Sequence, residues 1–154
     1  MLGTLNDAQI ERLLTQCQTG RIGCHAFGKT YVVPVSYAYK NDCVYVHSYD
    51  GLKLSMMRQN PEICFQVELM EDFGNWQSVI AWGTFKELKN KDERNEGLRI
   101  LTARTFSGVT SETVKLGQLW PFAPVDTTNI EGIVFRILLS EKSGRYETAP
   151  SQTK

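Results

Sequence analysis

The pattern of apolar and polar positions predicts a chain made of short helices and a larger number of strands. Near the N-terminus, four apolar residues recur at helical spacing, with Thr4 or Asn6 as a cap before them and Gly20 as a stop after them: Ile10, Leu13, Leu14 and Cys17. From residue 21 the stretches 21–27, 31–39 and 43–47 are rich in Val, Ile and Tyr, with turn-forming residues between them. This part predicts three consecutive antiparallel strands.

The remainder of the chain predicts two more helices and three more strands. Residues 52–58 have helical spacing before Asn60-Pro61 ends the helix, and a capping-box pattern at Asn90 begins a charged helix that runs to about Arg104. The predicted strands are residues 63–69, 76–88 and 133–140, whereas 107–129 is irregular and 150–154 is a tail. Six mostly hairpin-linked strands that must protect their edges favour a small antiparallel barrel or a strongly coiled sheet with helices packed around it.

Composition narrows the class of protein. The chain has 154 residues, of which 42% are hydrophobic, and shows no repeat, so residues 1–154 are predicted to form one domain with one core. Seventeen basic residues balance seventeen acidic ones, which argues against a nucleic-acid partner. No apolar run is long enough for a membrane span and no secretory signal is present, so we expect a cytoplasmic protein without a membrane partner. The four cysteines lack metal-binding spacing and predict reduced thiols.

The chain offers little acid–base chemistry of its own, because it has two histidines, His25 and His47, and no nucleophile motif. An enzyme of this composition would depend on a cofactor. The most informative segment is a strand that runs through His47 and Ser48 into a turn and then a helix whose first turn carries Lys53. A helix N-terminus with a lysine predicts a phosphate site. The alternative is that Asp50 caps the helix, Lys53 is solvated and His47 binds a backbone carbonyl.

A second unusual position is Pro34, which removes a hydrogen-bond donor from the middle of a predicted strand. Such a strand needs an edge position, a bulge or a ligand beside it. A flat aromatic ligand would use the free backbone groups, and a plain edge strand or bulge would need none. The sequence leaves both interpretations open.

Several segments, taken in order, resemble the FMN-binding split β-barrels related to pyridoxamine 5′-phosphate oxidase, and most closely the nitroimidazole-resistance type. The matching segments are residues 31–39, the turn 40–42, the strand 44–48, Gly51-Leu52-Lys53, Asn60-Pro61, residues 78–83 and the Glu93-Arg94 helix. The resemblance covers about residues 5–105 and fades beyond them. It implies a mainly β fold, a six-stranded antiparallel split β-barrel of Greek-key type, which forms a homodimer with one FMN in each of two interface clefts.

The resemblance also implies roles for individual residues. Lys53 and the strand end Val46-His47-Ser48 would hold the phosphate, the backbone of Val33, Pro34, Val35 and Ser36 would line the isoalloxazine, and Ser78 would contact the flavin. Trp120 or Phe122 would cover the site of the partner subunit. His47 is the candidate catalytic residue, which would polarise or protonate a substrate, with a structural or phosphate-side role as the alternative.

The implied function is hydride transfer between a reduced donor, with NADH or NADPH as the candidate, and a small-molecule substrate through FMN. The oxidases carry basic residues where this chain has Tyr31, Ser36 and Leu52, and the C-terminal substrate segment of the oxidases is missing, which argues against vitamin B6 oxidation. Two alternatives remain: a non-catalytic flavin-binding or storage protein, and a haem-binding split barrel with His25 or His47 as the ligand.

Overall fold

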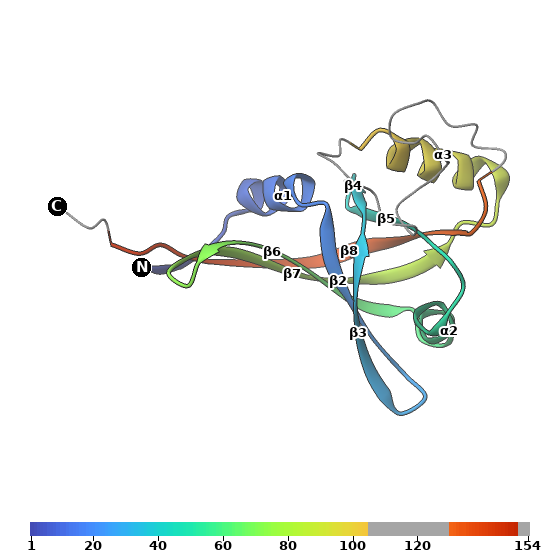
Figure 1. The fold of residues 1–154 in the computed structure, drawn as a ribbon, viewed down its shortest axis with the longest axis horizontal. Helices are drawn as coiled ribbons and strands as arrows, with labels where there is room; N and C mark the ends of the chain where they lie inside the picture. Colours follow the sequence, from blue (N-terminus) through green and yellow to red (C-terminus); the bar gives the residue numbers. More distant parts are fainter. Residues whose placement is uncertain (105–129, 151–154) are drawn as a thin grey trace.

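The computed structural model describes residues 1–104 and 130–150 (Figure 1). The described part contains three helices and eight strands. In chain order they are β1 (Leu2–Thr4), α1 (Asp7–Gln16), β2 (Thr19–Ala26), β3 (Lys29–Ser36), β4 (Ala38–Lys40), β5 (Cys43–Ser48), α2 (Leu52–Gln59), β6 (Glu62–Asp72), β7 (Asn75–Glu87), α3 (Lys91–Thr102) and β8 (Ile133–Glu147).

All eight strands belong to one antiparallel sheet, which confirms the prediction of a mainly β fold. The strand order is β3-β2-β6-β7-β8-β5-β4, and β1 adds to the far end of β8. Within the described residues the sheet is open, with β3 and β4 as its edges. Figure 1 shows that β6, β7 and β8 extend together into a long arm that ends near the N-terminus. Closure of the barrel and dimerisation stay predictions.

The predicted count of six strands is wrong, because the described residues form eight. The two additional strands have different origins. The expected single strand over residues 31–39 is divided at Tyr37 into β3 and β4, because the Tyr37 backbone N–H donates to the Gln18 carbonyl and its ring enters the core. The Tyr37 hydroxyl donates to the Leu14 carbonyl at 2.6 Å. The other addition is β1, which is only three residues long and therefore shows no usable periodicity.

The last strand, β8, is longer than the predicted 133–140 because it pairs with β7 along almost the whole length of both strands. The arm lacks a clear two-residue alternation beyond residue 140, so the sequence hides this extension. Helix starts were predicted more closely. The Asn6 side chain caps α1 in a capping box with Gln9, and the Asn90 side chain accepts from the N–H groups of Asp92 and Glu93.

The main hydrophobic core lies between the sheet and α1 and also includes the buried side of α2. Its largest fully buried side chains include Tyr37 and Phe65, whose rings meet edge to face with centroids 5.0 Å apart. A smaller cluster lies under α3 and includes Leu98 and Leu101. All four cysteines are free, as predicted. No helix in the described residues is long and apolar enough to cross a membrane.

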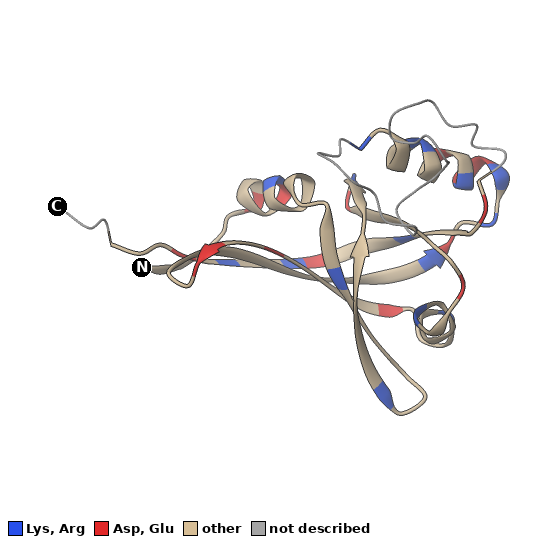
Figure 2. Cartoon of the chain, viewed as in Figure 1, with Lys and Arg blue, Asp and Glu red and all other residues tan. Residues whose placement is uncertain are grey.

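A charged cluster ties α1 to the sheet. Lys142 of β8 is mostly buried and pairs with the carboxylates of Glu11 and Asp42, and its ammonium also donates to the Tyr39 hydroxyl at 2.9 Å. Lys142 holds the pKa of Asp42 below its usual range, and burial raises the pKa of Tyr39 to about 12. Elsewhere basic and acidic side chains are interspersed over the ribbon, consistent with the balanced composition (Figure 2).

Candidate functional site

The candidate phosphate site is the junction between β5 and α2. Every residue of β5 is buried, and the strand ends at Ser48, which pairs with Ile133 of β8. The chain then turns through Tyr49 and Asp50, and Gly51 is the N-cap of α2. Gly51 has no side chain to accept from the first-turn N–H groups, and the α2 start has no side-chain cap. These donors are therefore available to an anion.

Lys53 lies in the first turn of α2 and is half-buried. Burial lowers the pKa of its ammonium group. Within residues 1–104 and 130–150 no carboxylate or other hydrogen-bond acceptor pairs with this ammonium. A partly desolvated cation at an uncapped helix start is an arrangement that an anion would stabilise.

Asp50 is adjacent to this site, but its carboxylate pairs with Arg58 and not with Lys53. Its Oδ1 accepts from the Gly51 backbone N–H at 3.0 Å and from Arg58 Nη1 at 3.1 Å. Arg58 also makes two hydrogen bonds to the carboxylate of Glu87. The interpretation that Asp50 caps α2 is wrong, because the cap position belongs to Gly51. The negative charge of Asp50 is thus paired before any anion approaches Lys53.

The side chains of His47 and Ser48 are buried and bind backbone carbonyls. His47 Nε2 donates to the Glu131 carbonyl at 2.6 Å, and the ring meets the ring of Tyr49 edge to face at 5.8 Å. Ser48 Oγ donates to the Tyr49 carbonyl at 3.0 Å. The structure therefore places the candidate catalytic residue next to the phosphate site, with its Nε2 proton directed at the protein itself. Val46, the third residue of this strand end, lies in the core.

Pro34 lies on β3, which is an edge strand of the sheet. It stands opposite Arg21 of β2 and is exposed, whereas Val35 faces the core and Val33 packs partly against it. An edge position explains how the strand tolerates a proline. Since both valine side chains point inward, the polar groups at this edge are the backbone from Val33 to Ser36 and the Ser36 hydroxyl, which already bonds to Gln18 and Arg104.

Ser78 of β7 is not brought to this junction within one subunit. It lies on the outward face of the sheet, with β2 and β6 between its strand and β3. Its Oγ accepts from Gln66 Nε2 at 3.2 Å, and Gln66 also bonds to Glu68 and Arg21. His25 is at the β2–β3 hairpin, where its Nδ1 meets the Thr30 hydroxyl at 2.9 Å. Trp120 and Phe122 lie outside the described residues.

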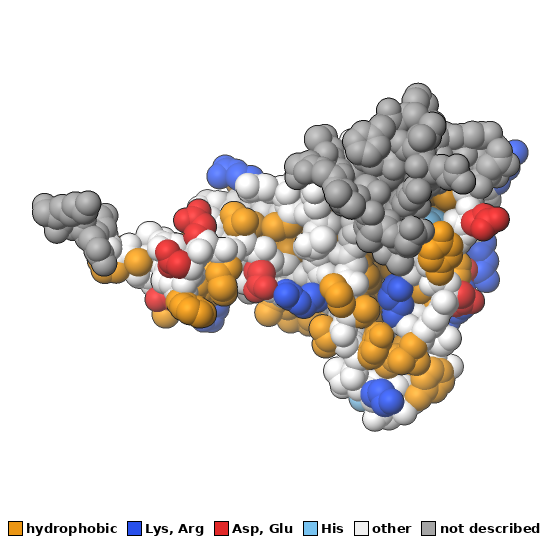
Figure 3. All heavy atoms as spheres, viewed as in Figure 1, with side chains coloured by type: hydrophobic (Ala, Val, Ile, Leu, Met, Phe, Trp, Pro, Cys, Tyr) orange, Lys and Arg blue, Asp and Glu red, His pale blue; other side chains and the backbone are white. Residues whose placement is uncertain are grey.

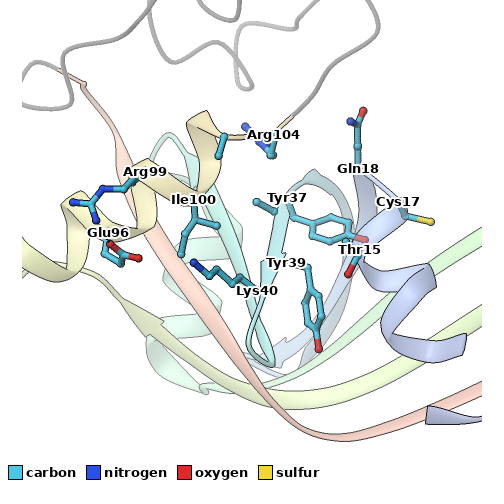
Figure 4. Close-up of a pocket in the computed structure, with 12 residues that line it drawn as sticks. Thr15, Cys17, Gln18, Tyr37, Tyr39, Lys40, Glu96, Arg99, Ile100 and Arg104 are labelled. Carbon is cyan, nitrogen blue, oxygen red and sulfur yellow. Dashed lines mark hydrogen bonds and ion pairs between the residues drawn. The ribbon is translucent and has the colours of Figure 1, made fainter. Parts of the chain in front are cut away.

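Sequence reasoning missed a cavity of about 430 Å³ between the end of α1, β4 and α3 (Figure 4). Its lining includes aromatic and aliphatic side chains, three cations (Lys40, Arg99 and Arg104) and the carboxylate of Glu96, which pairs with Arg99. Arg104 Nη1 donates to Ser36 Oγ at 3.0 Å, which places the cavity beside the end of β3. Burial lowers the pKa of Arg104 to about 10. The charges of the helix predicted to run to about Arg104 are typical of a solvated outer face. That prediction is wrong for Arg104, whose guanidinium is largely buried.

A second cavity is a groove of about 670 Å³ on the outward face of the sheet. Its lining includes the outward residues of β2, β3, β6 and β7, among them Val32, Cys64 and Trp82. Large apolar side chains on this face are exposed, namely Val32, Ile80, Trp82 and Leu138. Figure 3 shows hydrophobic side chains gathered along the arm and in the lower part of the molecule around β3 and α2.

The described residues form a mainly β protein built on one antiparallel sheet, with an open β3 edge and a lysine at the uncapped start of α2. The chain belongs to the family described as pyridoxamine 5′-phosphate oxidase, which it matches over residues 6–146. The match continues well past residue 105, where the sequence resemblance fades, and reaches the end of β8.

Three known proteins illustrate the similarity. A FAD-binding protein from Mesorhizobium loti has a TM-score of 0.72 and 28% identity, over 96% of this chain and 99% of that one. A protein from Bacteroides thetaiotaomicron assigned to 5-nitroimidazole antibiotic resistance shares the fold with a TM-score of 0.67 and 19% identity, over 95% and 89% of the two chains. An uncharacterized protein from Rhizobium meliloti is 32% identical over 68 residues, which is 44% of this chain and 45% of that protein.

Proposed function

We propose that this protein binds FMN between two copies of the chain and uses it to transfer hydride between a reduced nicotinamide donor and a small-molecule substrate in the cytoplasm. The observation that carries the proposal is the Lys53 ammonium, half-buried at the uncapped start of α2 with no acidic partner in the described residues. The flavin-binding relative from Mesorhizobium loti, similar over nearly the whole chain, supports the cofactor class.

The residues at the junction fit a phosphate group. A phosphate ester carries nearly two negative charges at neutral pH and needs several donors. The open N–H groups of α2 would contribute about 0.3–2 kcal/mol through the helix dipole, and each hydrogen bond to the charged group about 1.5–3 kcal/mol. The ion pair with Arg58 reduces the repulsion between the neighbouring Asp50 carboxylate and the phosphate.

The β3 edge fits the planar ring system. Its backbone from Val33 to Ser36 runs along the open side of the sheet, and Pro34 removes one N–H that would otherwise need a partner there. Ring burial requires a second wall. The outward face of β7, with Trp82 in the groove and Ser78 further along the same strand, would supply that wall from a second subunit, because β2 and β6 separate Ser78 from β3 within one subunit.

Bound FMN would supply the hydride-transfer chemistry at its ring system. The chain's own residues would fix the phosphate at Lys53, hold the ring against the β3 backbone and exclude water at the subunit interface. The cavity beside Ser36 has the volume of a small-molecule site and would take the substrate, with Arg104 as a nearby positive charge.

The test of this proposal is direct. Purified protein is expected to be yellow, and denaturation is expected to release a flavin whose mass identifies it as FMN. Anaerobic mixing with NADH or NADPH should then bleach the flavin absorption. A colourless protein that binds no added FMN or FAD overturns the cofactor. A released FAD overturns the choice of FMN, and a bound flavin that no donor bleaches indicates a flavin-storage protein.

Replacing Lys53 with alanine is expected to weaken FMN binding by about 10- to 100-fold, because one hydrogen bond to a charged group is lost. Fluorescence titration of the flavin-free protein with FMN measures the change. Lys53→Arg should retain most of the affinity, and Lys29→Ala, which removes an exposed lysine from β3, is the matched control. Equal affinities for wild type and Lys53→Ala would remove Lys53 from the site.

The same lysine predicts a pH dependence. Because burial lowers the pKa of free Lys53 below its ordinary value, the ammonium loses its proton at lower pH than an exposed lysine would. FMN affinity is therefore expected to fall as pH rises toward the ordinary lysine range, since binding the anion then requires uptake of a proton. Lys53→Arg should flatten this decline, because arginine stays charged throughout the same range. Identical alkaline profiles for the two proteins would contradict the assignment.

A further inference from the structure

Three consecutive backbone carbonyls are held by side chains from distant elements at the point where the chain enters β8. Arg94 of α3 donates through Nη2 to the carbonyls of Ile130 at 2.8 Å and Gly132 at 3.2 Å. His47 of β5 donates through Nε2 to the carbonyl between them, that of Glu131, at 2.6 Å. The segment 130–132 is therefore fixed by two side chains, one from α3 and one from β5.

Gly132 is what allows this close approach. Its φ is +96°, and a Cβ at this position would lie 2.7 Å from His47 Nε2 and 3.0 Å from the Ser48 carbonyl oxygen. Neither neighbour can yield easily, because the Ser48 carbonyl is backbone and His47 is buried. The backbone at Gly132 thus lies directly on the end of β5.

The end of β5 is also the start of the phosphate site. Ser48 pairs with Ile133, immediately after the held segment, and leads within a few residues to Gly51 and Lys53. On the other side, Ile130 packs with Leu98 and Leu101 of α3. The clamp of His47, Arg94 and Gly132 consequently links α3 and β8 to the strand end that presents α2.

We propose that His47 is a positioning residue, which with Arg94 and Gly132 fixes the strand end before the flavin phosphate site, and not the acid that protonates substrate. Its Nε2 proton is committed to a carbonyl at 2.6 Å, and its side chain is 6% exposed. Both the neutral Nε2–H tautomer and the imidazolium donate to that carbonyl, so the contact survives either charge state. The effect on flavin binding rests on the function proposed above.

The experiment compares His47→Ala with Gly132→Ala, because the second variant disturbs the same contact without removing any side chain that could do chemistry. Each is expected to weaken FMN affinity by about tenfold, and the double variant should be hardly weaker than either one. At saturating FMN, kcat and its pH profile should stay close to those of the wild type. His47→Gln, whose amide can donate to the same carbonyl, should restore most of the affinity.

Gly28→Ala is the matched control, because Gly28 also has a positive φ of +69° but a Cβ added there would have no atom within 4 Å. It shares the backbone strain of Gly132→Ala and lacks the contact with His47. It should leave FMN affinity near that of the wild type. Loss of kcat in flavin-saturated His47→Ala, with Gly132→Ala unaffected, would overturn the proposal in favour of a catalytic histidine.

A flavin-independent measurement separates this proposal from the one on which it rests. In the flavin-free protein, hydrogen exchange at the amides of residues 130–134 should become faster in His47→Ala and in Arg94→Met, and stay unchanged in Gly28→Ala. Faster exchange in a protein that binds no flavin would support the clamp while the cofactor proposal fails. Unchanged exchange in both clamp variants would overturn the clamp, whatever the protein binds.

Discussion

Replacing Trp82 with glutamate is expected to convert the proposed FMN-containing dimer into a monomer that does not retain FMN. Trp82 is 40% exposed on the outward face of β7 and lines the groove of about 670 Å³. Beside it stand Cys64 of β6, its direct partner in the sheet, and Ile80 of its own strand. A patch of this kind in the middle of a sheet face is typical of a subunit contact.

The expected change in dimer affinity follows from two effects: an aromatic side chain is lost from the interface, and a carboxylate is buried in its place. An aromatic anchor at the centre of an interface contributes about 2 kcal/mol or more, and an unpaired carboxylate in the same place opposes association by several kcal/mol. The dimer dissociation constant should therefore rise by more than about a thousandfold. Because Ser78 reaches the flavin only from a second subunit in this proposal, FMN should be lost together with the dimer.

Light scattering coupled to size exclusion and the absorption spectrum measure the two outcomes on one sample. Phe73→Glu is the matched control, since Phe73 is 92% exposed at the β6–β7 hairpin tip, away from the groove, and should leave both properties unchanged. A Trp82→Glu protein that remains a dimer with bound FMN would show that the groove is not the subunit interface. A monomer that keeps FMN would show that the flavin site is complete in one chain.

The parts of this structure that could be predicted from the sequence are those determined by residues close together in the chain. Val and Tyr enrichment between turn residues located β5, and a two-residue alternation located most of β6. The cap at Asn90 was visible because a cap and its helix are adjacent in sequence. The lysine after Gly51 was found for the same reason. Each of these features depends on a few consecutive residues, and local pattern is sufficient to specify them.

The features that could not be predicted depend on residues far apart in the chain. Glu131 lies 84 residues from the histidine that binds its carbonyl, and the Lys142 ammonium pairs with Glu11 across 131 residues. A histidine or lysine shows no local sign of such a contact. The contact of Arg104 is of the same kind, because its guanidinium donates to the Ser36 hydroxyl, 68 residues away in the chain. The break at Tyr37 is likewise tertiary, since the core takes the ring and the Gln18 carbonyl takes the backbone N–H.

Phe65→Ala is expected to lower the free energy of unfolding by about 3–5 kcal/mol, because it removes a large, completely buried side chain. The Phe65 side chain is completely buried on β6 and meets the ring of Tyr37 edge to face. It also fills the space above Gly20 of β2, where an added Cβ would lie 2.6 Å from the phenyl ring. The Tyr37 ring and the β2 backbone at Gly20 thus both pack on this ring, so the surrounding structure has little freedom to collapse into the cavity.

The close approach between Gly20 and Phe65 provides an internal check on that number. Gly20→Ala alone should destabilise the protein through the clash, and in the double variant the added methyl should occupy part of the space that Phe65→Ala leaves empty. The double variant should then be less destabilised than the sum of the two single variants. Urea unfolding measures all four proteins, and Phe73→Ala at the exposed hairpin tip should change the free energy by less than about 0.5 kcal/mol. Additive effects of the two core substitutions would mean that Gly20 and Phe65 do not share one packing site, and a loss below about 1 kcal/mol for Phe65→Ala would mean that this ring is not central to the core.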